Sequence, residues 1–294
     1  MSNYIRNNFE IETGSKILAD AGKYRYGFYP FSSAMKKHTG LTTTKMYKKS
    51  VADLQQVWIE ENNKLNLTKS ELIPTKNTKT VTNYTFPHYL NDGSLIALKH
   101  SFKETPYLVI FKDGKEHKLA TIGIATQEFL SVVNNKIAWT EHQKDLRHAN
   151  KNYSNIITFD INTKSYKKLT QKERYFSPSH SNSGEKIASI RYKENIEYVI
   201  DIIDAKNGAT IDSIPNPNND FLSTPKWTKN DTAIIYLAKR NSKLAFFRYN
   251  FNTKTRQQLS EWTANTIGQF SLGNNAILTI APPVIIADKP WLIS

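Results

Sequence analysis

The chain contains no cysteine among its 294 residues, which excludes disulfide bonds, thiolate zinc ligands and a cysteine nucleophile. It also lacks an apolar run long enough to cross a bilayer. The longest, AILTIAPPVIIA at residues 276–287, is short and contains two prolines. The N-terminal sequence MSNYIRNNFEIETG has no apolar core of the kind found in signal peptides. We therefore expect no membrane span, and these features leave the compartment undecided.

Three signatures of catalysis or nucleotide binding are missing as well. The sequence contains no His-Glu-x-x-His, no Gly-x-Ser-x-Gly and no P-loop. Glu141, His142 and His148 form the only cluster that resembles a set of metal ligands, but the two histidines lie six residues apart on a predicted hairpin. The interpretation of this cluster is a solvated polar loop. We therefore expect no metal and no cofactor, and the sequence favours a chain that is not itself an enzyme.

The charge of the chain is strongly positive but evenly spread. Forty lysines and arginines against 26 acidic residues give a net charge of +14, and no block of five like charges occurs. Lysines stand singly in turns and at alternate strand positions, as in NTKSYKKLT. A solvated basic surface is therefore favoured over a nucleic-acid site, which remains a less favoured alternative.

Residues 1–72 have the apolar spacing of helices. In SVADLQQVWIEENNKL, Val51, Leu54, Val57 and Trp58 fall on one helical face, and Ser50 is the predicted N-cap. Gly40 is a predicted helix stop, and the threonines at 42–44 are expected to cap a short helix that follows it. A polar linker is predicted at residues 73–83.

From Tyr84 to Ser294 the pattern changes to β and repeats. The segments LNDGSLIALKHSF, SNSGEKIASIRYK and TKNDTAIIYLAKR each place a polar turn before an apolar strand. Anchor residues mark five units, each with an isoleucine nine residues later: Pro87, Glu128, Pro178, Pro225 and Gly268, followed by Ile96, Ile137, Ile187, Ile234 and Ile277. Four strands in a unit, with a period between 40 and 50 residues, indicate a β-propeller whose isoleucines are buried between blades.

The fifth unit is too short to complete a blade. It runs only from Gly268 to Ser294, so two or three strands are expected instead of four. The predicted fold is therefore mainly β, with four full units, a partial fifth and an incomplete ring. Open sheet edges at the Tyr84 and Ser294 ends predict self-association, and we expect the chain to be a segment of a longer protein or a truncated gene product.

Two sets of residues are candidates for binding. Tyr89, Leu130, His180, Trp227 and Phe270 share one position of the repeat and are expected to point between blades, so their neighbours should face a central channel. That channel set comprises His88, Phe129, Ser179, Lys226 and Gln269, whose polar and basic members are suited to an anion or a peptide terminus. The second set lies in or beside the long loop at residues 143–152, within one unit, and comprises Glu141, Asp145, Arg147 and His148.

The repeat resembles that of TolB-like propellers, whose signature runs Pro-x-aromatic-Ser-Pro-Asp-Gly-x-x-Ile-Ala. It appears here as SPSHSNSGEKIA, FPHYLNDGSLIA and TPKWTKNDTAII. The segment ILADAGKYRYGFYPFSSAMKKHTGLTTTKMYKKSVADLQQVW is similar to the end of the peptidase MA-like domain that precedes such propellers in some exported bacterial proteins. The resemblance implies a periplasmic or extracellular location, although the zinc-binding motif of that domain is absent from this chain.

Three functions remain open at this point. The favoured hypothesis is a non-catalytic module that binds a protein or peptide. The first alternative is the substrate-filtering, C-terminal portion of a zinc metallopeptidase whose catalytic helix lies outside this chain. The second is a nucleic-acid-binding propeller, which only the charge suggests.

Overall fold

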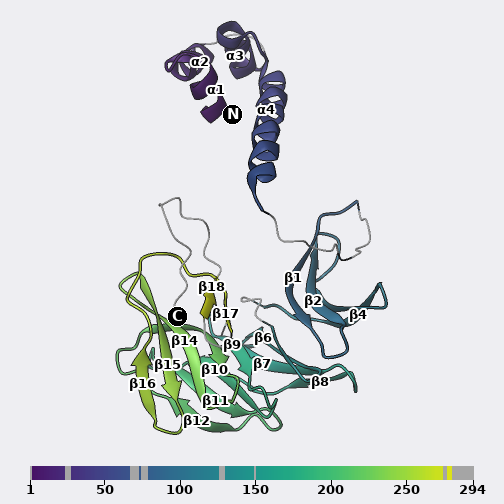
Figure 1. Ribbon diagram of the computed structural model, residues 1–294, viewed down its shortest axis with the longest axis vertical. Coiled ribbons are helices and arrows are strands. Elements are labelled where there is room, and N and C mark those ends of the chain that lie inside the picture. Colours follow the sequence, from purple (N-terminus) through teal and green to yellow (C-terminus); the bar gives the residue numbers. More distant parts are fainter. Residues whose placement is uncertain are drawn as a thin grey trace. The chain divides into compact units, whose positions relative to one another are not determined.

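The computed structural model describes residues 2–23, 28–66, 73, 79–125, 130–148, 150–273 and 277–279. Contacts within the chain divide it into two compact units, Met1–Leu72 and Ile73–Ser294 (Figure 1). The described part of the first unit is helical and that of the second is formed of β-strands. In the parts of the chain that the structure describes, no helix is both long and apolar enough to span a membrane.

The first unit contains α1 Ser2–Asn8, α2 Thr13–Gly22, α3 Pro30–Thr39 and α4 Thr43–Lys64. Its core is small because only one face of each short helix contributes to it. The buried members of this core are Ile5, Ile17, Ala34, Met35 and Met46. Gly40 ends α3 in the left-handed conformation, with a φ of 76°, as the sequence predicted.

Helix α4 corrects two details of the sequence analysis. Its N-cap is Thr42, whose side chain accepts a hydrogen bond from the backbone N–H of Lys45. The predicted short helix and the helix predicted to start after Ser50 are one continuous helix. Ser50 lies inside it, and its hydroxyl donates to the carbonyl of Tyr47. The prediction of Ser50 as an N-cap was wrong because the threonine cap lies eight residues upstream of it.

The second unit consists of five antiparallel sheets among its described residues, which we call blades 1 to 5 in chain order. Four of them have four strands and blade 5 has two. Blade 1 comprises β1 Thr82–Tyr89, β2 Leu95–Ser101, β3 Tyr107–Lys112 and β4 Lys115–Thr121; blade 2 comprises β5 Ser131–Val133, β6 Lys136–Lys144, β7 Asn152–Asp160 and β8 Ser165–Lys168. Blade 3 comprises β9 Tyr175–His180, β10 Lys186–Tyr192, β11 Tyr198–Asp204 and β12 Thr210–Ile214; blade 4 comprises β13 Phe221–Trp227, β14 Ala233–Arg240, β15 Lys243–Asn250 and β16 Thr255–Gln258; blade 5 comprises β17 Phe270–Leu272 and β18 Ile277–Thr279.

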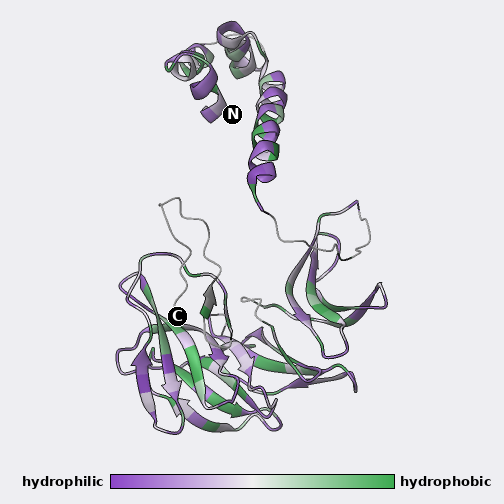
Figure 2. Ribbon diagram, viewed as in Figure 1, coloured by the Kyte–Doolittle hydropathy of each residue, from purple (hydrophilic) through white to green (hydrophobic). Residues whose placement is uncertain are grey.

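The core of the second unit lies between consecutive blades. The second and third strands of a blade are apolar on both faces, and Figure 2 shows hydrophobic colour on β14 and hydrophilic colour on the outer strand β16. The repeated isoleucines of the four full blades are completely buried: Ile96, Ile137, Ile187 and Ile234. Blade 5 covers the far side of blade 4, where Phe270 packs edge-on against Phe246 with ring centroids 5.1 Å apart. This confirms a mainly β chain built of propeller blades, and no extensive contact joins blade 5 to blade 1 among the described residues.

The residue after the predicted channel position packs against the preceding blade. Trp227 donates from its indole Nε1 to the carbonyl of Ser179, 2.9 Å away, and the backbone N–H of His180 donates to Ser131. Leu130 and Phe270 are buried in the same way. Tyr89 was expected to be buried too but is 74% exposed, because blade 1 is the first sheet of the described chain and Tyr89 has no preceding blade to pack against.

A β-bulge recurs in the first strand of blades 1, 3 and 4. In each case the residue before the anchoring proline has a left-handed φ: 54° at Phe86, 48° at Ser177 and 46° at Thr224. The ladder with the second strand skips at the same place, for example between Ser223 and Lys226 in β13. Proline cannot donate a ladder hydrogen bond, so a bulge accommodates it inside a paired strand.

The polar turns that mark the repeat in sequence touch one another in space. The carboxylate of Asp231, in the turn of blade 4, accepts hydrogen bonds from the backbone N–H groups of Asn182 and Ser183 in the turn of blade 3, at 2.8 and 3.0 Å. The side-chain amide of Asn182 also donates to Asp231 and to the carbonyl of Thr228. The recurring turn therefore joins blade 3 to blade 4.

Candidate functional site

A pocket of about 340 Å³ opens where blades 3 and 4 meet the segment before blade 5. Its lining comes from β9, β10, β11, β13, β14 and β15 together with Ile267 and Gly268. None of the lining side chains is an Asp, Glu, His, Lys or Arg. Ligand pockets are typically about 300–1,000 Å³ and mostly apolar with a few polar groups, so this pocket has the size for one compact group.

One wall of the pocket is aromatic. Tyr192 and Tyr198 lie with ring centroids 5.0 Å apart, and Tyr198 meets Phe221 edge-on at 5.2 Å. Phe176 adds a fourth ring to the lining. Aromatic pairs in such geometries contribute about 0.5–1.5 kcal/mol beyond the area that they bury. The wall is therefore suited to a further planar ring.

The polar residues of the lining include both bulged positions of the neighbouring blades, Ser177 and Thr224. Thr224 is unusual in two ways. A β-branched residue rarely adopts a left-handed φ, which costs about 1–3 kcal/mol. Its Oγ1 atom is also buried, and it has no hydrogen-bond partner among the described residues. The pocket thus contains a strained residue with an unused hydroxyl.

Two matched substitutions test whether the hydroxyl of Thr224 is unused. Thr224 and Thr170 are almost equally buried, but Oγ1 of Thr170 accepts a hydrogen bond from the backbone N–H of Ile156 at 2.9 Å. We expect Thr224→Val to leave the free energy of unfolding unchanged or to raise it by up to about 1 kcal/mol, and Thr170→Val to lower it by about 1–3 kcal/mol. Urea unfolding of both variants checks this, and an equal loss in the two would contradict it.

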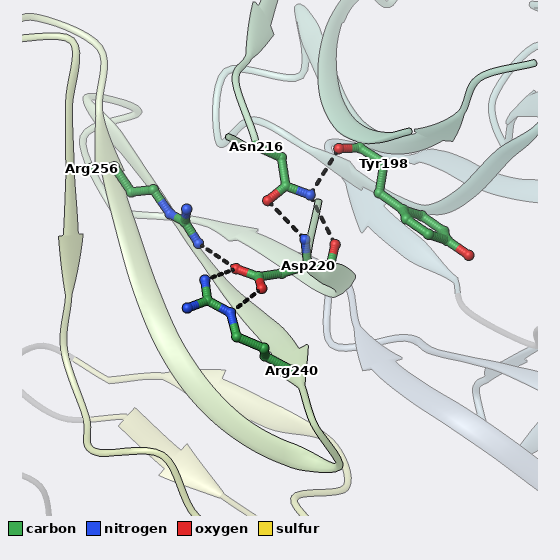
Figure 3. A network of polar contacts seen from close by, with 5 residues as sticks. All are labelled: Tyr198, Asn216, Asp220, Arg240 and Arg256. Carbon is green, nitrogen blue, oxygen red and sulfur yellow. Dashed lines mark hydrogen bonds and ion pairs between the residues drawn. The ribbon is translucent and has the colours of Figure 1, made fainter. Parts of the chain in front are cut away.

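A network centred on Asp220 holds the aromatic wall in place (Figure 3). The side chain of Asp220 is fully buried and accepts from Nε and Nη2 of Arg240 at 2.6 and 2.8 Å and from Nη2 of Arg256 at 3.2 Å. Asn216 donates to the carbonyls of Tyr198 and Asp220 at 2.9 and 2.8 Å. Because Phe221 follows Asp220 directly, the network fixes two residues of the wall, Tyr198 and Phe221.

Two of the predicted channel residues lie within electrostatic range of each other. Burial lowers the pKa of His88, and the positive charge of Lys226 lowers it further. His88 in β1 of blade 1 is therefore near enough to Lys226 in β13 of blade 4 for the two charges to interact. Burial also lowers the pKa of Lys226, which has no ion pair among the described residues. A half-buried ammonium group without a carboxylate partner is suited to an anion.

The other predicted channel residues contribute less clearly. Ser179 is buried, and Gln269 is exposed just before β17. Phe129 and the anchor Glu128 lie outside the described residues. Binding by the channel set as a whole stays a prediction.

The long loop between β6 and β7 is held by its own aspartate. The carboxylate of Asp145 accepts from the backbone N–H groups of Arg147 and His148 at 2.9 and 3.0 Å and from the hydroxyl of Tyr153 at 2.9 Å. These hydrogen bonds, with that from the Arg147 N–H first, lower the pKa of Asp145 to about 2. Arg147 and His148 are exposed. Asp145 thus shapes the turn, and binding by the exposed pair stays a prediction.

Glu141 is also engaged by the fold. Its carboxylate accepts from the indole Nε1 of Trp139 at 2.8 Å, the hydroxyl of Tyr166 at 2.8 Å and the backbone N–H of Gly123 at 2.6 Å. A side chain at Gly123 would collide with this carboxylate, since an added Cβ would lie 2.6 Å from Oε2. These contacts indicate a structural role that ties the segment before blade 2 to β6. No group of three potential metal ligands occurs in the described parts of the chain.

The pocket is not evident from the sequence. Its lining comes from residues between 176 and 268, in two blades and the segment before a third, and no local motif connects them. One signal was present, because two of the prolines that anchor the repeat mark the bulges at Ser177 and Thr224. The sequence does not show that these two residues form bulges and line a pocket, because that depends on their φ angles and their burial.

Comparisons with known proteins show a likeness in fold. No family model matches the chain, and no curated protein matches it in sequence. Oligogalacturonate lyase from Vibrio parahaemolyticus matches 70% of this chain over 61% of its own, with a TM-score of 0.50 and 11% identity. TolB from Acinetobacter baumannii matches 60% of this chain over 43% of its own (TM-score 0.47, 18% identity), and a putative TolB from Agrobacterium tumefaciens 58% over 63% (TM-score 0.47, 8% identity). The chain thus spans less than two thirds of the length of these proteins, and the likeness concerns the propeller fold alone.

Proposed function

We propose that the blades form a non-catalytic module that binds an extended peptide segment of another protein, with the pocket between blades 3 and 4 as its principal site. One observation carries the proposal: the pocket has a binding-site volume and an aromatic wall, yet its lining contains no acid, base or cation. General acid–base catalysis needs a group that titrates near the working pH, and burial raises the pKa of Tyr198 in the wall still further above that range. The pocket is therefore equipped for recognition and not for chemistry.

The charge of the chain favours a partner segment with acidic residues. The net charge of +14 attracts anionic partners and speeds their association. Lys226, two residues after Thr224 in β13, supplies a cation that has no carboxylate partner among the described residues. We expect binding of acidic peptides to weaken as the salt concentration rises. A periplasmic or extracellular location stays a prediction, based on the resemblance of the sequence alone.

Filling the pocket is expected to abolish peptide binding. Ser223 lines the pocket and is half-buried, so a tryptophan there would occupy the space of the incoming group. Peptides are first selected on the purified full chain from a library with aromatic and acidic positions. We expect Ser223→Trp to weaken the best of them about tenfold or more, as measured by fluorescence anisotropy.

The matched control is Ser165→Trp, which places the same bulky residue at an exposed position of the outer strand β8. Its affinity for the selected peptides should equal that of the wild type. A library that yields no binding peptide, or peptides that bind Ser223→Trp as well as the wild type, would contradict the proposal.

A further inference from the structure

The lining of the pocket restricts the kind of ligand group that can enter it. The wall of Tyr192, Tyr198 and Phe221 offers ring faces and edges for stacking, and the lining has no charge to compensate a charged ligand group. Burial of an unpaired charge is strongly unfavourable, so the part of a ligand that enters must be neutral. A planar aromatic group meets both conditions.

The hydroxyl of Thr224 narrows the choice among aromatic groups. In the described structure Oγ1 is buried without a partner, while the residue as a whole lines the pocket. Rotation about χ1 moves the hydroxyl of a threonine to another of the three staggered positions around Cβ, so a ligand can draw the hydroxyl toward itself without a movement of the backbone. A hydroxyl both donates and accepts, and its best complement is another hydroxyl. The bulge before Pro225 holds Thr224 at the pocket, although its left-handed φ is strained.

We propose that the pocket takes the side chain of a tyrosine in the bound peptide, with the ring against the Tyr192–Tyr198–Phe221 wall and the phenol hydroxyl bonded to Oγ1 of Thr224. This inference rests on the proposed function, because it assigns the anchor residue of the same peptide. The volume of about 340 Å³ is large enough to accommodate one such ring. The remainder of the peptide lies outside the pocket.

The test compares two small probes on two forms of the protein. N-acetyl-tyrosinamide and N-acetyl-phenylalaninamide differ only in the phenol hydroxyl, and Thr224→Val removes the threonine hydroxyl at nearly constant shape. NMR titration of the full chain should show the tyrosine probe binding the wild type about two- to tenfold more tightly than the phenylalanine probe. In Thr224→Val the two probes should bind equally, and both should fail to bind Ser223→Trp.

Several outcomes would overturn the inference, and they differ from the failure of the proposed function. Equal affinities of the wild type for the two probes would show that Thr224 does not bind the phenol hydroxyl. A preference for the tyrosine probe that persists in Thr224→Val would show the same. Some peptides could lose affinity for Ser223→Trp but bind equally well with phenylalanine in place of their tyrosine. This result would overturn the tyrosine assignment and leave the proposed function standing. Binding of the tyrosine probe without binding of any peptide would overturn both.

Discussion

Replacing Ile187 by aspartate is expected to unfold the blades. Ile187 has no exposed surface and lies in a cluster formed by blades 2 and 3 with Ala138, Ile156 and Ile203. A carboxylate at this position would be buried without a partner, at a cost of several kcal/mol, whereas the whole stability of a domain is about 5–15 kcal/mol. Circular dichroism should show a lost or strongly lowered melting transition.

The control for this prediction is the same substitution at Ile211, which is half exposed in β12 of blade 3. Because Ile211→Asp places the new carboxylate in water, we expect its free energy of unfolding to lie within about 0.5 kcal/mol of the wild type. Equal melting temperatures for Ile187→Asp and the wild type would refute the assignment of the repeated isoleucine to the space between blades.

Removing the carboxylate of Asp220 is the second change with a large expected effect. Asp220→Ala leaves two guanidinium groups without their counter-ion, and one of them, Arg256, is mostly buried. Breaking a buried ion pair in this way costs about 3–5 kcal/mol. Urea unfolding at neutral pH should show this loss.

The pH dependence of the Asp220 contribution follows from its pKa. Burial alone would raise the pKa of Asp220, but the hydrogen bonds from Arg240 and Arg256 outweigh it, and the net shift is downward. A carboxyl group with a lowered folded-state pKa contributes its full stability above its unfolded pKa, about 3.9, and loses it as the pH falls through the folded value. The difference in stability between wild type and Asp220→Ala should therefore be constant from pH 5 to 7 and shrink below about pH 4.

Asp212→Ala provides the matched control, since Asp212 is exposed in β12 and, among the described residues, its carboxylate accepts only from the adjacent Ser213 N–H. This variant should be about as stable as the wild type both between pH 5 and 7 and below pH 4. A gap between Asp220→Ala and the wild type that stays constant down to pH 2 would contradict the ionic account of the network.

The sequence predicted the features that depend on local spacing. A polar turn that recurs from blade to blade, with an isoleucine nine residues after each anchor, identified the buried isoleucines, including Ile187 and Ile234, without any knowledge of tertiary contacts. The prediction that Tyr89 lies between blades was wrong for a related reason. A shared position in a repeat implies a shared environment only where the neighbouring blade is present.

The candidate site could not be predicted from the sequence, because it is formed by contacts between residues far apart in the chain. Asp220 meets Arg240 and Arg256 across 20 and 36 residues of chain, and charged residues at such separations are common in this basic sequence. Among the described threonines, Thr224 is distinguished by a buried hydroxyl that has no hydrogen-bond partner there, and not by its residue type. Asp145 in the long loop and Glu141 in β6 attracted interest by their charge, but their carboxylates are largely engaged within the fold.

The hydrogen bonds between the turns of blades 3 and 4 couple the unfolding of the two sheets. Asn182 and Ser183 lie in a turn at the surface, yet their amide hydrogens point at the carboxylate of Asp231, which belongs to the next sheet. Fraying of blade 4 therefore breaks hydrogen bonds of blade 3, so the two sheets are expected to open as one cooperative unit. The exchange of those two amides with solvent deuterium then reports the detachment of blade 4, although neither amide belongs to it.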